Sequence, residues 1–122
     1  MRRSRFETLV AEALDGLPSD FQEKIDNVEV VIEDWPSRQQ LRKMGVPYGD
    51  SLYGTYEGVP LTKRTSRYGL VMPDRITIYQ RPIEACCRNE DEVRRQVRRV
   101  VLHEVGHYFG ISDERLKELD AY

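Results

Sequence analysis

The strongest constraint on this chain is the pentapeptide H-E-V-G-H at residues 103–107. Its two histidines are the only histidines among the 122 residues, and they are four positions apart. Residues four apart on an α-helix lie on one face, one turn above the other. The two imidazoles can therefore act together only if this segment is helical, so the flanking residues must specify a helix.

The flanking residues do predict a long helix. Asn89 is a favourable N-cap residue, and Glu92 follows three positions later, as in a capping box. Acidic residues at 90–92 suit the first turn, where the helix dipole favours negative charge. Gly110 is expected to end the helix in a left-handed conformation. An apolar stripe at helical spacing connects the two ends: Val93, Val97, Val100 and Val101.

On such a helix, His103 and His107 can bind one zinc ion, because imidazole nitrogens coordinate zinc at about 2.0–2.1 Å. Glu104 is adjacent to the first histidine and can accept a proton from a water molecule at the open coordination position. This combination is typical of zinc metallopeptidases. The alternative is an ordinary amphipathic helix whose two histidines have no shared role.

A third metal ligand is harder to identify from the residues. Catalytic zinc usually has three protein ligands, and no third histidine exists, so the third must be a carboxylate or a cysteine. Asp113 is the best candidate, because a chain reversal at Gly110 would return it toward the histidines. Asp113 could instead cap a short helix that follows it. Glu114 is a weaker candidate, and the neighbouring Cys86 and Cys87 are weaker still, because such thiols are more often buried and inert.

The run from His103 to Asp113, H-E-x-x-H-x-x-G-x-x-D, resembles the signature of a family of short bacterial zincin-like metallopeptidases. The segments LYGTYEGVPLT at 52–62 and PDRITIYQRPIE at 73–84 are also similar to that family. The resemblance implies a minimal zincin α+β fold with Zn²⁺ as cofactor. It further implies His103, His107 and Asp113 as metal ligands and Glu104 as general base.

The sequence departs from larger enzymes with an extended motif of this kind. Asp113 stands where metzincins carry a third histidine, and no methionine follows it. Only nine residues follow Asp113, which leaves no subdomain to form the other wall of a cleft. We therefore expect slow proteolysis of large substrates and, as an alternative function, a non-catalytic zinc-stabilised interaction module.

The remaining segments predict a single α+β domain over residues 1–122, with a small mixed sheet packed against helices that include the motif helix. Helices are expected at about 5–14, at 19–25 with Ser19 as the cap, at 37–44, and around Leu116 and Leu119. Strands are expected at 28–32, 52–57 and 75–80.

The composition limits the classes of partner and the location that we expect for this protein. The net charge of -2 gives no overall attraction to nucleic acid or anionic membranes. We expect a peptide or an unfolded protein segment as substrate; the oligomeric state stays open. The N-terminal 18 residues contain acidic interruptions that do not suit a secretory signal, and there is no disulfide framework, so a cytoplasmic location is expected.

Three further features have a structural and a functional interpretation. The arginines at 94, 95, 98 and 99 are interpreted as a solvated face supported by Glu90–Arg94 and Asp91–Arg95 pairs, rather than as a binding patch. A tyrosine from the middle of the chain could donate to an oxyanion, and the sequence does not choose among Tyr53, Tyr56, Tyr68 and Tyr79. Trp35 is expected to anchor the chain beside Pro36.

Overall fold

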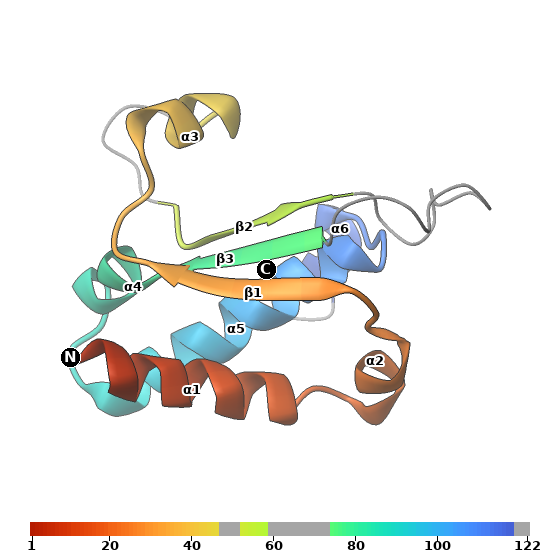
Figure 1. Cartoon of the computed structure of the whole chain (residues 1–122), viewed down its shortest axis with the longest axis horizontal. Coiled ribbons are helices and arrows are strands. Elements are labelled where there is room, and N and C mark those ends of the chain that lie inside the picture. Colours follow the sequence, from red (N-terminus) through yellow and green to blue (C-terminus); the bar gives the residue numbers. More distant parts are fainter. Residues whose placement is uncertain (47–51, 59–73, 119–122) are drawn as a thin grey trace.

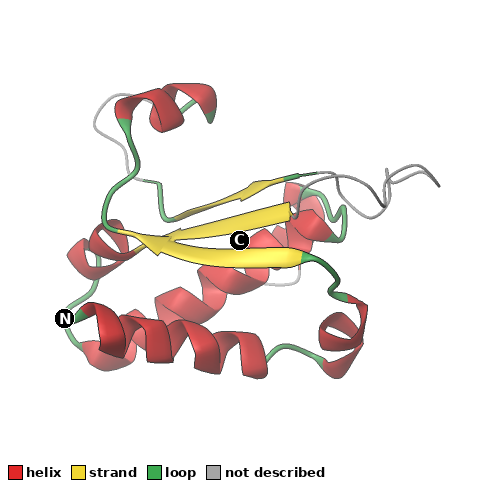
Figure 2. Cartoon of the chain, in the orientation of Figure 1, coloured by secondary structure: helices red, strands yellow, loops and turns green. Residues whose placement is uncertain are grey.

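The computed structural model describes residues 1–46, 52–58 and 74–118, with helices and strands in mixed order (Figures 1 and 2). No helix in these ranges is long and apolar enough to cross a membrane. The elements are α1 (Arg3–Asp15), α2 (Ser19–Lys24), β1 (Val28–Glu33), α3 (Arg38–Lys43), β2 (Gly54–Glu57), β3 (Asp74–Tyr79), α4 (Gln80–Ala85), α5 (Glu90–Tyr108) and α6 (Asp113–Glu118).

The three strands form one mixed sheet in the order β1-β3-β2. β3 runs parallel to β1, with Val30 beside Ile76, and antiparallel to β2, with Thr55 beside Thr77. Among the described residues, β2 is thus an edge strand. This arrangement confirms the predicted α+β class with a small mixed sheet.

Helices α1 and α5 lie on the same side of the sheet, and their apolar faces form much of the core (Figure 1). The Glu12 carboxylate of α1 also pairs with Arg94 of α5, with Nε and Oε2 3.3 Å apart. This packing fixes α5 against both α1 and the sheet. The core residues of α1 are Phe6, Leu9, Val10 and Ala13, those of β3 are Ile76 and Ile78, and those of α5 are Val93, Val97, Val100, Val101 and Val105.

Two predictions and one omission need correction. Ser19 is the first helical residue of α2 rather than its cap, and Pro18 takes the cap position without a side-chain hydrogen bond. Helix α4 was not predicted, and its first residue, Gln80, falls within the predicted strand 75–80. Pro82 lies in the first turn of α4, where a missing N–H costs no helical hydrogen bond. Trp35 is 60% exposed, so the prediction that it anchors the chain was wrong.

Candidate active site

Helix α5 begins where the sequence predicts. The Asn89 side chain accepts a hydrogen bond from the Glu92 N–H at 2.9 Å, which satisfies one of the free donors at the helix start. The Glu92 carboxylate accepts from the N–H of Arg88 at 2.5 Å, one residue before the cap, instead of from Asn89 itself. The cap therefore fixes the start of the helix that contains both histidines.

The same helix ends in a Schellman-type turn. Gly110 has φ +74°, as predicted for a left-handed C-terminal cap. Its N–H donates to the His107 carbonyl at 2.9 Å, and the Ile111 N–H donates to the Gly106 carbonyl at 2.9 Å. The chain therefore reverses directly after the motif.

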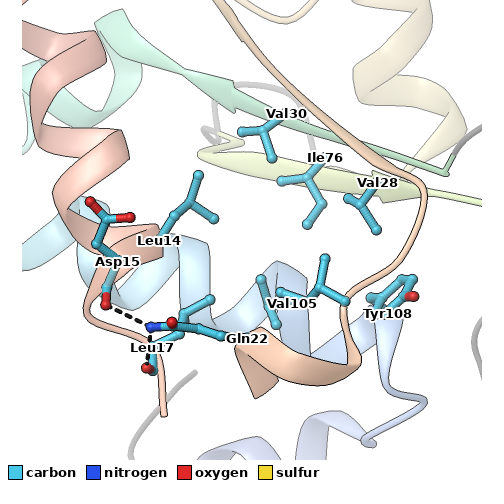
Figure 3. A pocket seen from close by; sticks show the side chains of 10 residues that line it. Leu14, Asp15, Leu17, Gln22, Val28, Val30, Ile76, Val105 and Tyr108 are labelled. Atoms are coloured by element: carbon cyan, nitrogen blue, oxygen red, sulfur yellow. Dashed lines mark hydrogen bonds between the residues drawn. The ribbon is translucent and has the colours of Figure 1, made fainter. Parts of the chain in front are cut away.

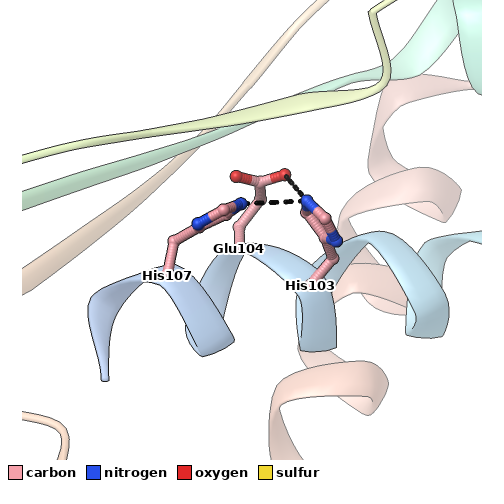
Figure 4. Close-up of side chains that lie close together, drawn as sticks. All are labelled: His103, Glu104 and His107. Atoms are coloured by element: carbon pink, nitrogen blue, oxygen red, sulfur yellow. Dashed lines mark hydrogen bonds and ion pairs between the residues drawn. The ribbon is translucent and has the colours of Figure 1, made fainter. Parts of the chain in front are cut away.

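The two histidines and Glu104 come together on α5 (Figure 4). The Nε2 atoms of His103 and His107 are 3.0 Å apart. The Glu104 Oε2 atom lies 3.9 Å from the Nε2 of His103. Each side chain offers a potential ligand atom, and these atoms lie within 4.8 Å of one another.

The donor set fits a zinc ion. Two nitrogens bound to one tetrahedral zinc at about 2.0–2.1 Å are about 3.3 Å apart, so the two rings need to separate by only a few tenths of an ångström. At 3.0 Å one ring nitrogen can also donate a hydrogen bond to the other. Both arrangements require the two Nε2 atoms to lie close together on the same side of α5, and they do so here.

Glu104 is held between α5 and β2. It is 6% exposed. A Cβ atom on Gly54 would lie 3.3 Å from the Cγ of Glu104 and 2.8 Å from a methyl carbon of Val100. Glycine at 54 therefore permits the edge strand to approach the helix at the acid. This contact was not predicted from the sequence.

A cavity of about 480 Å³ opens beside this group. It is lined by polar and apolar side chains and lies between the start of β2 and the second half of α5. His103 and Glu104 are among the side chains that form its wall. The other lining residues are Leu52, Tyr53, Gly54, Gln96, Arg99 and Val100.

Of the tyrosines considered from sequence, Tyr53 lines this cavity. Burial, and secondarily the neighbouring Cys86, raise the pKa of Tyr53, so its hydroxyl stays protonated at neutral pH. Tyr56 instead donates to the Asp74 carboxylate at 2.6 Å, and Tyr79 is 3% exposed in the core. Tyr68 lies outside the described residues.

Asp113 is the first residue of α6, and its side chain lies outside what the structure describes. Its role as third ligand therefore stays a prediction. The alternative role as helix cap is taken by its neighbour, because the Ser112 hydroxyl accepts a hydrogen bond from the Arg115 N–H at 3.2 Å. Asp113 is thus not required to begin the helix.

The weaker candidates for the third metal ligand are not part of the group that contains the two histidines. Among the described residues, the metal-ligating group contains neither Glu114 nor the two cysteines. Cys86 is exposed and Cys87 is half-buried, with their Sγ atoms 3.7 Å apart, so the expectation of buried thiols was wrong.

The arginine-rich face is only partly neutralised by ion pairs within the described part of the chain. Arg94 pairs with Glu90, as expected, and also with Asp91 and Glu12. The expected Asp91–Arg95 pair does not form, because Asp91 is paired with Arg94 at 3.3 Å.

A second cavity, of about 280 Å³, lies where α1, α2, β1 and β3 meet α5 (Figure 3). Its wall is largely apolar and includes Val105 and Tyr108 of α5 but neither motif histidine. The Gln22 amide beside it donates to the carbonyls of Asp15 and Leu17, at 2.6 and 2.7 Å. The polar groups with catalytic potential are therefore at the first cavity.

Comparison with known proteins identifies the family and supports the fold. A conserved hypothetical protein from T. thermophilus has a similar structure, with a TM-score of 0.57 and 20% sequence identity over 98% of this chain and 97% of that chain. A search of curated proteins found no significant match. The family model for zincin-like metallopeptidases matches residues 25–122, which include every element from β1 to α6. Because the match covers most of the sequence, the chain belongs to the zincin-like metallopeptidase family.

Proposed function

We propose that this protein is a zinc-dependent peptidase that hydrolyses peptides or unfolded protein segments. The observation that carries the proposal is the convergence of His103, His107 and Glu104 on one face of α5, beside a cavity. Family membership implies a bound metal, usually zinc, and the histidine nitrogens suit that ion. His103 and His107 would hold the ion, with Asp113 as the third ligand.

When bound, zinc would act as a Lewis acid, which makes a coordinated water more acidic and polarises the carbonyl group of the peptide bond. Glu104 accepts the proton of the attacking water and then donates it to the leaving amine nitrogen. Its 6% exposure limits competition from bulk water for this proton. The contact with β2 at Gly54 restricts the motion of the carboxylate and so keeps it near His103.

The edge position of β2 supports a peptide substrate. In the described part of the chain this strand pairs with β3 alone, and its first residue lines the cavity. An extended peptide can add to such an edge by main-chain hydrogen bonds, with its side chains entering adjacent pockets. That arrangement favours flexible peptides over folded proteins.

The proposal is tested with zinc-loaded protein, its Glu104→Gln variant and a broad peptide library. Glutamine keeps the size of the side chain but cannot act as a base. We expect zinc stoichiometry to be unchanged and peptide cleavage to fall by about 10²–10⁴-fold. A His103→Ala, His107→Ala double variant should lose both zinc and activity.

Two results would contradict the proposal. A zinc-loaded parent that cleaves no peptide would favour a zinc-stabilised interaction module. A Glu104→Gln protein as active as the parent would indicate a contaminating protease.

A further inference from the structure

Arg99 lies in the wall of the cavity that contains His103 and Glu104. It precedes His103 by four residues, so it lies one helical turn away on the same side of α5. No carboxylate within residues 1–46, 52–58 or 74–118 forms an ion pair with it. Arg94, on the same helix, has three such partners.

The described lining of the cavity has one acidic and one basic side chain. Glu104 is nearly buried and is assigned to proton transfer, whereas Arg99 is exposed. Gln96, one turn before Val100, adds a neutral amide. The remaining lining residues are apolar or uncharged apart from His103. A ligand that enters the cavity therefore meets one positive charge, that of Arg99, which forms no ion pair with a described carboxylate.

We propose, on the basis of the peptidase function above, that Arg99 selects substrates with a carboxylate next to the cleaved bond. Guanidinium groups bind carboxylates through paired, charge-assisted hydrogen bonds. The carboxylate can come from an Asp or Glu side chain or from the C-terminus of a short peptide. Arg99 is thus a specificity-determining residue, and the protein favours acidic or carboxylate-terminated peptides.

The matched control is Arg98. It is exposed on the same helix but does not line the cavity, so Arg98→Glu changes the net charge by the same amount as Arg99→Glu. An effect of overall charge would appear in both variants. An effect of the cavity would appear only in Arg99→Glu.

The experiment measures cleavage of peptides that differ only in charge near the cleaved bond. One pair compares Asp or Glu with Asn or Gln in C-terminally amidated peptides; a second compares free-acid with amidated peptides. We expect the parent to favour at least one carboxylate source by about tenfold, as for a partly solvated charge-assisted bond. Arg99→Glu should abolish or reverse that preference, Arg99→Lys should keep part of it, and Arg98→Glu should keep all of it.

Binding separates this inference from the proposed function. Dye-labelled peptides of each pair are titrated into zinc-loaded Glu104→Gln protein with and without Arg99→Glu, and anisotropy is recorded. An Arg99-dependent preference in binding supports the inference even if the parent cleaves nothing. Cleavage or binding without charge preference, or equal effects of Arg98→Glu and Arg99→Glu, would overturn it while leaving the hydrolase question to the cleavage assay.

Discussion

Gly54 and Glu104 are fifty positions apart in the sequence, and a Cβ on Gly54 would lie only 3.3 Å from the Cγ of Glu104. The same Cβ would lie 2.8 Å from Val100 and 3.2 Å from the Thr77 carbonyl. The edge strand therefore touches the helix at the acid that the proposed reaction uses. Any side chain at position 54 must displace β2 or the Val100 side chain, and it would also crowd Glu104.

Gly54→Ala should accordingly reduce activity more than it reduces zinc binding. An added methyl in a tight contact costs about 1–3 kcal/mol of stability, and a shift of about 1 Å at a catalytic group can cost about a hundredfold in rate. The two histidines are on α5 and do not depend on position 54. Peptide cleavage, zinc affinity and urea unfolding should be measured together. A Gly54→Ala protein with the stability and activity of the parent would show that β2 does not restrain Glu104.

Tyr108, the last residue of α5, should contribute to stability through the turn before β1. Its hydroxyl donates to the Asp26 carbonyl and accepts from the Asp26 N–H, both at 3.0 Å, and the residue is fully buried. Tyr108→Phe would leave both backbone groups without this partner. We expect a loss of about 1–3 kcal/mol in the free energy of unfolding, measured with urea. A change of less than about half a kcal/mol would indicate that water replaces the hydroxyl.

Cys87 should react slowly with alkylating agents at neutral pH. Burial, then the hydrogen bond and charge of Cys86, raise the pKa of the Cys87 thiol to about 11. The thiolate is the reactive form, so the labelling rate follows the thiolate fraction. This rate should increase about tenfold per pH unit until the pH approaches the pKa of Cys87. Iodoacetamide labelling between about pH 7 and pH 10, with peptide fragmentation to separate Cys87 from Cys86, measures this dependence. Labelling of Cys87 at neutral pH as fast as a cysteine in an unstructured peptide would contradict the assigned pKa.

The sequence predicted features that depend on nearby residues. The start of α5 follows from Asn89, and its end follows from Gly110, because caps are formed by residues within one turn of the helix terminus. The meeting of His103 and His107 follows from helical periodicity alone. These features depend only on residues that are close in the sequence, so the sequence alone is enough to predict them.

The sequence did not predict features that depend on contacts between distant segments. The approach of Gly54 to Glu104 joins β2 to α5, and the cavity joins Tyr53 to Arg99. The exposure of Cys86 was also missed, because it depends on how α4 packs rather than on residue type. Family membership, in contrast, was predicted from the motif and is confirmed.

The identity of the third ligand can be decided by comparing two adjacent residues. Ser112 caps α6, and Asp113 is the first residue of that helix. If Asp113 binds zinc, Asp113→Ala should weaken zinc binding by more than roughly a hundredfold, since even residues behind the ligands contribute about 10–100-fold. Ser112→Ala should instead cost about 1 kcal/mol through loss of the cap and leave zinc affinity near that of the parent. Zinc affinity is measured by competition with a chromophoric chelator, and helix content by circular dichroism.

Glu114→Ala serves as the control for loss of a neighbouring negative charge. Equal zinc affinity in Asp113→Ala and the parent would exclude Asp113 as a ligand. Equal losses in Asp113→Ala and Ser112→Ala would show that zinc binding depends on the conformation of this turn rather than on the Asp113 carboxylate.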